Sequence, residues 1–184
     1  MQELFKNEII LTEELNLQYA EASYKVYRKK YRIGIGIFAL VDLVLAGLCL
    51  FLYRMTALGA ALAVLAVALV ILVFYRGYLS GAKKSYDNLK KNYKGVPRMF
   101  ATFYDDHFER NTNRNTITVD YKDVTGTLET KDLMVVAVGK QGAIQQGILL
   151  EKKGFRTGSL EAFLKFLYEK CPQITEKDKK SYLQ

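Results

Sequence analysis

The sequence has few of the residues that most often bind metal ions or carry nucleophilic catalysis. His107 is the single histidine, and the two cysteines, Cys49 and Cys171, lie far apart in a chain of 184 residues. A zinc site needs several cysteine or histidine ligands, and Cys–His catalysis needs a base close to the thiol. Two such cysteines also suggest no disulfide framework. We therefore predict no metal, no cofactor and no catalytic residues, and we expect that the protein is not an enzyme.

Charge is nearly absent from residues 33–75, where Asp42 and Arg54 are the only charged side chains. Two apolar runs of 21 residues, 33–53 and 55–75, lie on either side of Arg54. At about 1.5 Å per residue, each run forms a helix of about 31 Å, which matches the thickness of a bilayer core. The alternative is a helical hairpin buried in a soluble protein, for which the chain has too little other apolar material. We predict a transmembrane hairpin with antiparallel helices.

Basic residues gather at the outer ends of the two apolar runs and are scarce between them. The loop between the runs carries Arg54 alone, whereas each outer flank carries at least three cations. In membrane proteins the excess of lysine and arginine lies in cytoplasmic loops. We therefore expect a multi-pass protein of the cell membrane with both termini in the cytoplasm. The flanking cations are Arg28, Lys29, Lys30 and Arg32 before the first run, and Arg76, Lys83 and Lys84 after the second.

The net charge of +8 is concentrated after the second apolar run. Residues 76–97 contain six basic side chains against one acidic side chain, Asp87, whereas residues 98–172 are nearly neutral. A nucleic-acid-binding domain carries its basic surplus on the domain surface, so we expect no nucleic-acid partner. A basic segment beside a membrane attracts anionic lipids. The predicted contacts with anionic lipids at the cytoplasmic face are Arg76, Lys83, Lys84, Lys90 and Lys91.

Heptad-like apolar spacing continues on both sides of the predicted hairpin, over residues 13–32 and 76–94. Thr12 followed by two glutamates is a typical helix start, and Pro97 after Gly95 is a typical stop. Residues 1–32 are thus expected to form an N-terminal cytoplasmic segment with a juxtamembrane helix, and residues 76–97 a basic juxtamembrane helix with a linker. The matched lengths favour an antiparallel two-helix stalk. The alternative places one or both helices on the membrane surface.

Short β-type runs replace the helical patterns from Arg98 onward. Ser159 caps a final amphipathic helix that stops at Pro172. We predict an α+β chain in which residues 98–172 form a small antiparallel β barrel or sandwich capped by this helix, before a polar tail of residues 173–184. We expect residues 98–184 to fold on their own. The predicted strands are 98–104, 107–111, 116–121, 124–130, 133–138 and 148–152, with a glycine-rich loop at 139–147.

Three motifs follow the two apolar runs: TFYDDHFERNT at 102–112, VDYKDVTGTLETKD at 119–132 and ILLEKKGFRTGSLEAFLKFL at 148–167. Their order resembles the YcxB-like family of bacterial membrane proteins. The resemblance implies two transmembrane helices and a C-terminal domain with a pleckstrin-homology-like (PH-like) fold, and it implies no reaction. Phosphoinositide-binding PH domains carry a basic loop after the first strand. Here Asp105 and Asp106 form that loop, which repels an anionic headgroup.

Asp42 is the one acidic side chain of the first apolar run and the tenth of its 21 residues. A carboxylate at this depth costs about 2.5–3.5 kcal/mol on insertion scales, and desolvation favours the neutral acid. Ala39 and Ala46 lie on the same helical face and form, with Asp42, a candidate intramembrane interface. Three roles stay open: a hydrogen bond within the hairpin, contact with a second copy or another membrane protein, and proton transfer.

Two functions from different classes fit these patterns. A membrane-anchored binding or scaffold protein presents the PH-like domain to a protein partner, through a surface or an exposed strand edge. An accessory subunit of a membrane transporter or membrane enzyme instead uses Asp42 at an intramembrane contact or a proton site. Asp42 alone offers the polar intramembrane group that the second function needs. We therefore favour the binding or scaffold protein.

Overall fold

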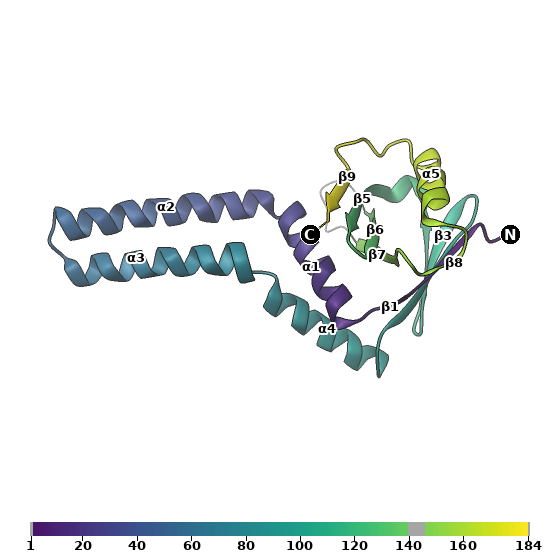
Figure 1. Ribbon diagram of the computed structural model, residues 1–184, viewed down its shortest axis with the longest axis horizontal. Coiled ribbons are helices and arrows are strands. Elements are labelled where there is room, and N and C mark those ends of the chain that lie inside the picture. Colours follow the sequence, from purple (N-terminus) through teal and green to yellow (C-terminus); the bar gives the residue numbers. More distant parts are fainter. Residues whose placement is uncertain (1, 140–145, 184) are drawn as a thin grey trace.

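The computed structural model describes residues 2–139 and 146–183. Within these residues the chain is α+β, with five α-helices and two β-sheets. A long helical hairpin occupies one end of the molecule and the sheets occupy the other, with two further helices between them (Figure 1). Most of the glycine-rich loop predicted at 139–147 lies outside the described residues.

The hairpin consists of α2 (Lys29–Phe51) and α3 (Thr56–Ile71), and α3 continues into one turn of π-helix, η1 (Leu72–Arg76). Its turn contains Arg54 in the left-handed region, at φ 52°. Small residues hold the two helices close together. A Cβ added to Gly59 would lie 2.5 Å from the Leu50 side chain and 3.0 Å from the Ala46 carbonyl oxygen. Both helices are long and apolar enough to cross a membrane.

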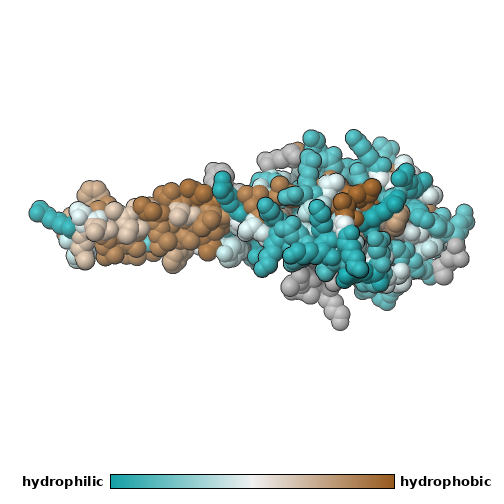
Figure 2. All heavy atoms as spheres, turned by 90° about the horizontal axis from the view of Figure 1, so that it is seen from below, coloured by the Kyte–Doolittle hydropathy of each residue, from teal (hydrophilic) through white to brown (hydrophobic). Residues whose placement is uncertain are grey.

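The hairpin exposes its apolar side chains instead of burying them. Only 17% of the most apolar window of each helix is buried. Phe38, Leu40 and Val64 are each about 60–70% exposed and point outward from the hairpin, which matches the apolar outer surface expected for a span in lipid. Figure 2 shows this apolar surface ending where the hairpin meets the polar surface of the sheet region. The hairpin therefore differs from a core helix pair of a soluble protein.

Helices α1 (Glu13–Tyr27) and α4 (Leu79–Tyr93) lie side by side at the base of the hairpin (Figure 1). Thr12 caps α1 by accepting a hydrogen bond from the Leu15 amide, as the sequence predicts. The buried Asn16 side chain donates to the Ala82 carbonyl at 2.9 Å and thereby joins the two helices. Helix α1 also packs on a sheet, where Ala22 is fully buried beside Leu128. The predicted stalk is thus part of the sheet domain.

The larger sheet has the order β4-β3-β2-β1-β8. Strands β2 (Arg98–Phe103), β3 (His107–Thr112) and β4 (Thr116–Asp120) confirm the predicted runs in this region. Strand β1 (Phe5–Ile10) lies between β2 and β8 (Phe155–Thr157) and pairs antiparallel with both. The sequence analysis placed this segment outside the β domain of residues 98–172. The structure corrects that boundary, because β1 is an inner strand of the sheet.

The smaller sheet has the order β7-β6-β5-β9. Strands β5 (Val124–Thr130), β6 (Leu133–Val138) and β7 (Gln146–Glu151) form an antiparallel meander, as predicted. Strand β9 (Lys179–Tyr182) pairs parallel with β5. The expected polar tail of residues 173–184 therefore supplies a strand. A Cβ on Gly126 would lie 2.7 Å from the Asp178 carbonyl oxygen, so this glycine allows the tail to approach.

The main core lies between the sheets and under α5 (Leu160–Lys170), which Ser159 caps as predicted by accepting from the Ala162 amide. Phe103 and Phe108 are fully buried, and their ring centroids are 5.1 Å apart. Phe163 of α5 reaches the same cluster, 4.6 Å from Phe103. Both sheets are open, which is consistent with the sandwich and not with a closed barrel. The short 3₁₀ helix η2 (Tyr121–Asp123) connects them.

Candidate functional site

The candidate intramembrane interface lies inside the hairpin. Asp42 is 6% exposed, and Ala39 and Ala46 are 1% and 2% exposed, so this face of α2 is covered by α3. The Oδ2 atom of Asp42 is buried and has no hydrogen-bond partner among the described residues. Asp42 is the only charged side chain in the two apolar runs, and Arg54 lies between them at the turn. The structure therefore places a solitary carboxyl group between two closely packed helices.

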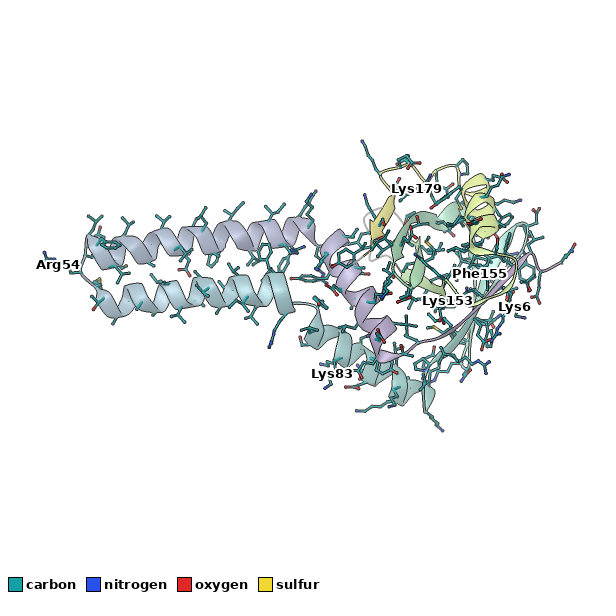
Figure 3. All side chains as sticks on the ribbon, viewed as in Figure 1. Lys6, Arg54, Lys83, Lys153, Phe155 and Lys179 are labelled. Carbon is teal, nitrogen blue, oxygen red and sulfur yellow. The ribbon has the colours of Figure 1, made fainter. Side chains whose placement is uncertain are left out.

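The five predicted lipid-contacting cations are all exposed. None of them forms an ion pair in the part of the chain that the structure describes. Figure 3 labels Lys83 on the side of α4 that is turned away from the sheets. The cations therefore leave a positive surface available beside the hairpin. They are Arg76 at the end of η1, and Lys83, Lys84, Lys90 and Lys91 on α4.

Changing Lys83 and Lys84 to glutamine should weaken the attachment of α4 to anionic vesicles by about 2 kcal/mol, at about 1 kcal/mol for each cation near the surface. The matched control changes Lys90 and Lys91. These lie seven residues further along α4, or about 10 Å, which is about one Debye length, so their loss should matter less. Amide hydrogen exchange of α4 in anionic and zwitterionic vesicles measures the difference. Equal protection in both variants and the parent chain would contradict a contact with anionic lipid.

A cavity of about 800 Å³ lies where the hairpin meets the rest of the molecule. Its walls come from the second half of α1, from residues 77–82 and from β6 and β7. Four tyrosines line it, together with small residues such as Ala20 and Gly81. Its volume falls in the range of small-molecule sites, about 300–1,000 Å³. The tyrosines are Tyr19, Tyr24, Tyr27 and Tyr78.

One tyrosine fixes the joint between the hairpin and α1. The Tyr24 hydroxyl donates to the Val73 carbonyl at 2.8 Å. The π-turn η1 departs from the regular helical hydrogen-bond pattern here, and the tyrosine gives this carbonyl a partner. Gly77 permits the approach, because a Cβ at this position would lie 2.5 Å from the Tyr24 hydroxyl. The joint thus holds one wall of the cavity in place.

The polar side chains among the described residues that line the cavity are hydroxyl groups and one guanidinium group, and the lining Tyr78 hydroxyl is hydrogen-bonded to Glu21. The Oγ atom of Ser23 is buried and has no hydrogen-bond partner within the described residues. The exposed Arg28 lies at the end of α1. Desolvation raises the pKa of the Tyr27 and Tyr78 hydroxyls, so both stay protonated at neutral pH. No acidic side chain is among the described residues that line the cavity.

The sequence analysis missed this cavity. It recognised the basic flank that includes Arg28 and considered Gly77 as a bend in the helix, but it did not single out Ser23 or Tyr24. These residues come from segments on opposite sides of the hairpin, and their meeting depends on how α1 turns into α2. A local signal existed in the tyrosines that precede and follow the two apolar runs. Their spacing alone predicts aromatic residues at a membrane surface and not a cavity.

Several polar groups of the sheet domain pair with one another. Glu8 forms ion pairs with Arg98 and Arg156 across three strands. Nδ1 of His107 lies 2.7 Å from an Asp106 carboxylate oxygen, beside the turn between β2 and β3. Among the described residues, no group of three potential metal ligands occurs. Within residues 2–139 and 146–183, these groups offer ion pairing and hydrogen bonding and form no nucleophile–base–orienter constellation.

No protein-family model and no curated protein matches the sequence. The functional assignment therefore depends on three features of the molecule itself. These are the exposed apolar hairpin, the exposed cations beside it and the cavity at its base.

Proposed function

We propose that this chain is a membrane-anchored binding or scaffold protein, with both termini in the cytoplasm, that presents its β domain to a protein partner. The observation that carries the proposal is the packing of α1, which contacts α4 on one side and the smaller sheet on the other. An apolar hairpin emerges directly from these packed helices. Such a connection, without a flexible linker, holds the β domain at the membrane surface.

The edge of the larger sheet is the surface proposed for the partner. Strand β4 is its outer strand, and Thr116, Thr118 and Asp120 are exposed on it. An extended segment of a partner adds to such an edge through main-chain hydrogen bonds. The other edges are less suitable, because β8 has three residues, β7 contacts β1, and β9 carries two lysines that discourage pairing.

The resemblance to the YcxB-like family supports the same proposal, with a bacterial origin and a PH-like fold for the β domain. A second candidate function is an accessory subunit of a membrane transporter or membrane enzyme. The observation that favours it is Asp42, a buried carboxyl group whose Oδ2 has no partner among the described residues. Ionisable groups inside a membrane mark ion or proton pathways in many proteins.

Labelling of one introduced cysteine at a time in intact cells tests the proposed topology. The parent variant carries Cys49→Ala. It keeps Cys171, because burial raises the pKa of this thiol to about 11 and leaves little reactive thiolate. Tyr53→Cys in the hairpin turn should react with a membrane-impermeant maleimide outside the cell. Lys177→Cys should react only after lysis. The reverse pattern, or reaction of both in intact cells, would contradict the topology.

A photo-crosslinking residue in place of Thr118 tests the partner surface in the same cells. Glu161 on the exposed side of α5 is the matched control position. We expect a discrete adduct with one other protein from position 118 and none from position 161. Absence of an adduct at position 118, or equal adducts at both positions, would contradict partner binding at β4.

A further inference from the structure

We infer that the cavity at the base of the hairpin binds one anionic phospholipid from the leaflet that faces the β domain. The inference rests on the proposed membrane insertion of the hairpin and extends it to a specific ligand site. None of the five predicted lipid-contacting cations is among the described residues that line the cavity, so it is a separate site.

The sequence positions of the lining residues indicate how deep the cavity lies in the membrane. Tyr27 and Arg28 come directly before α2, and Gly77 and Tyr78 come directly after η1. All four line the cavity. If the hairpin spans the bilayer core, residues immediately outside both spans lie at the level of the headgroups. The cavity therefore opens where a phospholipid places its phosphate and glycerol.

The charge of the cavity selects an anion. Arg28 supplies a cation without an ion-pair partner in the described structure, and Lys29 and Lys30 follow it on α2. The nearest acid along α1, Glu21, accepts a hydrogen bond from Lys25 at 2.8 Å. Desolvation raises the pKa of the Tyr27 hydroxyl. This hydroxyl and that of Ser23 can therefore donate to phosphate oxygens without adding negative charge, whereas the Tyr24 and Tyr78 hydroxyls already bond to the Val73 carbonyl and to Glu21.

The remaining lining is apolar and matches the glycerol and the upper acyl chain of a lipid. Tyrosine rings alternate with small side chains, and Val135 and Ala137 of β6 form the far wall. A free phosphate ion would use only the hydrogen-bond donors of the cavity, and the apolar lining would stay exposed to water. An amphipathic ligand covers both kinds of surface, which is why we assign a phospholipid to the site.

The cavity offers a variant that fills it without disturbing the fold. A Cβ added to Gly81 has no atom within 4 Å, so a larger side chain at this position enters open space. Gly81 lies within α4, where replacement of glycine improves helix propensity. Gly81→Leu should therefore block the cavity and keep the chain folded. Ser85→Leu, at an exposed position of α4 outside the lining, is the matched control.

The test uses the full chain in nanodiscs of phosphatidylcholine with a minor fraction of phosphatidylglycerol, followed by release into the gas phase and mass measurement of retained lipid. The parent chain and Ser85→Leu should retain one phosphatidylglycerol. Gly81→Leu should retain none. Arg28→Gln should bind about fivefold more weakly, as for one cation near the surface, whereas Lys84→Gln should keep the retained lipid. Full retention by Gly81→Leu would overturn the inference.

Two further arms identify the source of the bound group. Retention of phosphatidylcholine as readily as phosphatidylglycerol would overturn selection of an anion. Protection of the cavity from hydrogen exchange by inorganic phosphate alone, in detergent, would overturn the assignment to a lipid. Resistance of the chain to alkaline extraction from membranes is measured in parallel. Loss of that resistance refutes membrane insertion, whereas retained insertion with unchanged lipid binding in Gly81→Leu refutes only the cavity site.

Discussion

A fragment of residues 98–184 should show no cooperative unfolding transition, although the sequence alone predicts that it folds. The fragment lacks β1, the strand between β2 and β8. It also lacks Ile9 and Leu11, which are each 1% exposed. Burial of these two side chains contributes about 3–6 kcal/mol. The free energy of unfolding of a whole domain is only about 5–15 kcal/mol, so the loss of these two side chains alone approaches that free energy.

Polar contacts of β1 add to the expected loss. The Asn7 side chain donates to the Glu151 carbonyl at 2.8 Å and accepts from the Glu151 amide at 3.1 Å, which ties β1 to the smaller sheet. Without Glu8, the guanidinium groups of Arg98 and Arg156 lose their common partner. Without β1, the facing edges of β2 and β8 also lose their backbone partners.

The matched control removes the hairpin and keeps β1. In this variant a short flexible linker replaces residues 28–78 and joins α1 to α4. The joint is close enough for such a linker, because the ring centroids of Tyr24 and Tyr78 are 6.2 Å apart. We expect this chain to be soluble and to unfold cooperatively in denaturant, as followed by circular dichroism. A cooperative transition of equal midpoint in the 98–184 fragment would show that β1 is dispensable.

The difference between predicted and observed strands has a physical cause. Strands β2 and β4 to β7 were predictable because their apolar side chains recur with the period of a strand or fill a continuous run. Strand β3 buries only Phe108 and was predictable from the turn and loop residues that flank it. Strand β1 reads FKNEII, and its buried positions include Asn7 and Glu8. These polar side chains are buried because partners distant in the sequence satisfy them, through Glu151 and two arginines. A single sequence gives no indication of those partners.

The candidate sites also divide into features with a local sequence pattern and features that depend on contacts between distant segments. The apolar hairpin and its basic flanks are local patterns, so the sequence predicts both. The lysine-rich strand β9 carries no apolar period and owes its place to pairing with β5. The cavity depends on the angle between α1 and α2 and on the π-turn before Gly77. Neither feature has a sequence pattern, although Tyr24 and Gly77 are necessary for the observed joint.

Asp42→Ala should stabilise the inserted hairpin by about 2.5–3.5 kcal/mol, which is roughly a hundredfold in the insertion equilibrium. Asp42 is 6% exposed, and its Oδ2 has no hydrogen-bond partner among the described residues. Its removal therefore abolishes a desolvation cost and breaks no hydrogen bond or ion pair that the described residues show. Alanine also suits the closely packed face formed by Ala39 and Ala46.

Two further substitutions separate charge, polarity and volume. Asp42→Asn keeps the shape and a buried polar group, so its stability should stay within about 1 kcal/mol of the parent chain. Asp42→Leu removes the polar group but adds volume between the helices, and overpacking of about 1–3 kcal/mol offsets its gain. Fractional insertion of the hairpin measures the effect of removing the polar group. Thermal unfolding of the full chain in micelles measures the effect of the added side-chain volume.

The molecular mass of the assembly in micelles shows whether the Asp42 carboxyl group takes part in a contact between proteins. A stabilised Asp42→Ala variant of unchanged mass would mean that Asp42 makes no contact with a second copy and lowers the stability of its own hairpin. The accessory-subunit function then gains support, because a costly intramembrane carboxyl without a structural contact is typical of proton and ion pathways. A destabilised Asp42→Ala variant, or one of lower mass, would instead place the carboxyl in a contact between proteins and leave the scaffold function as the better account.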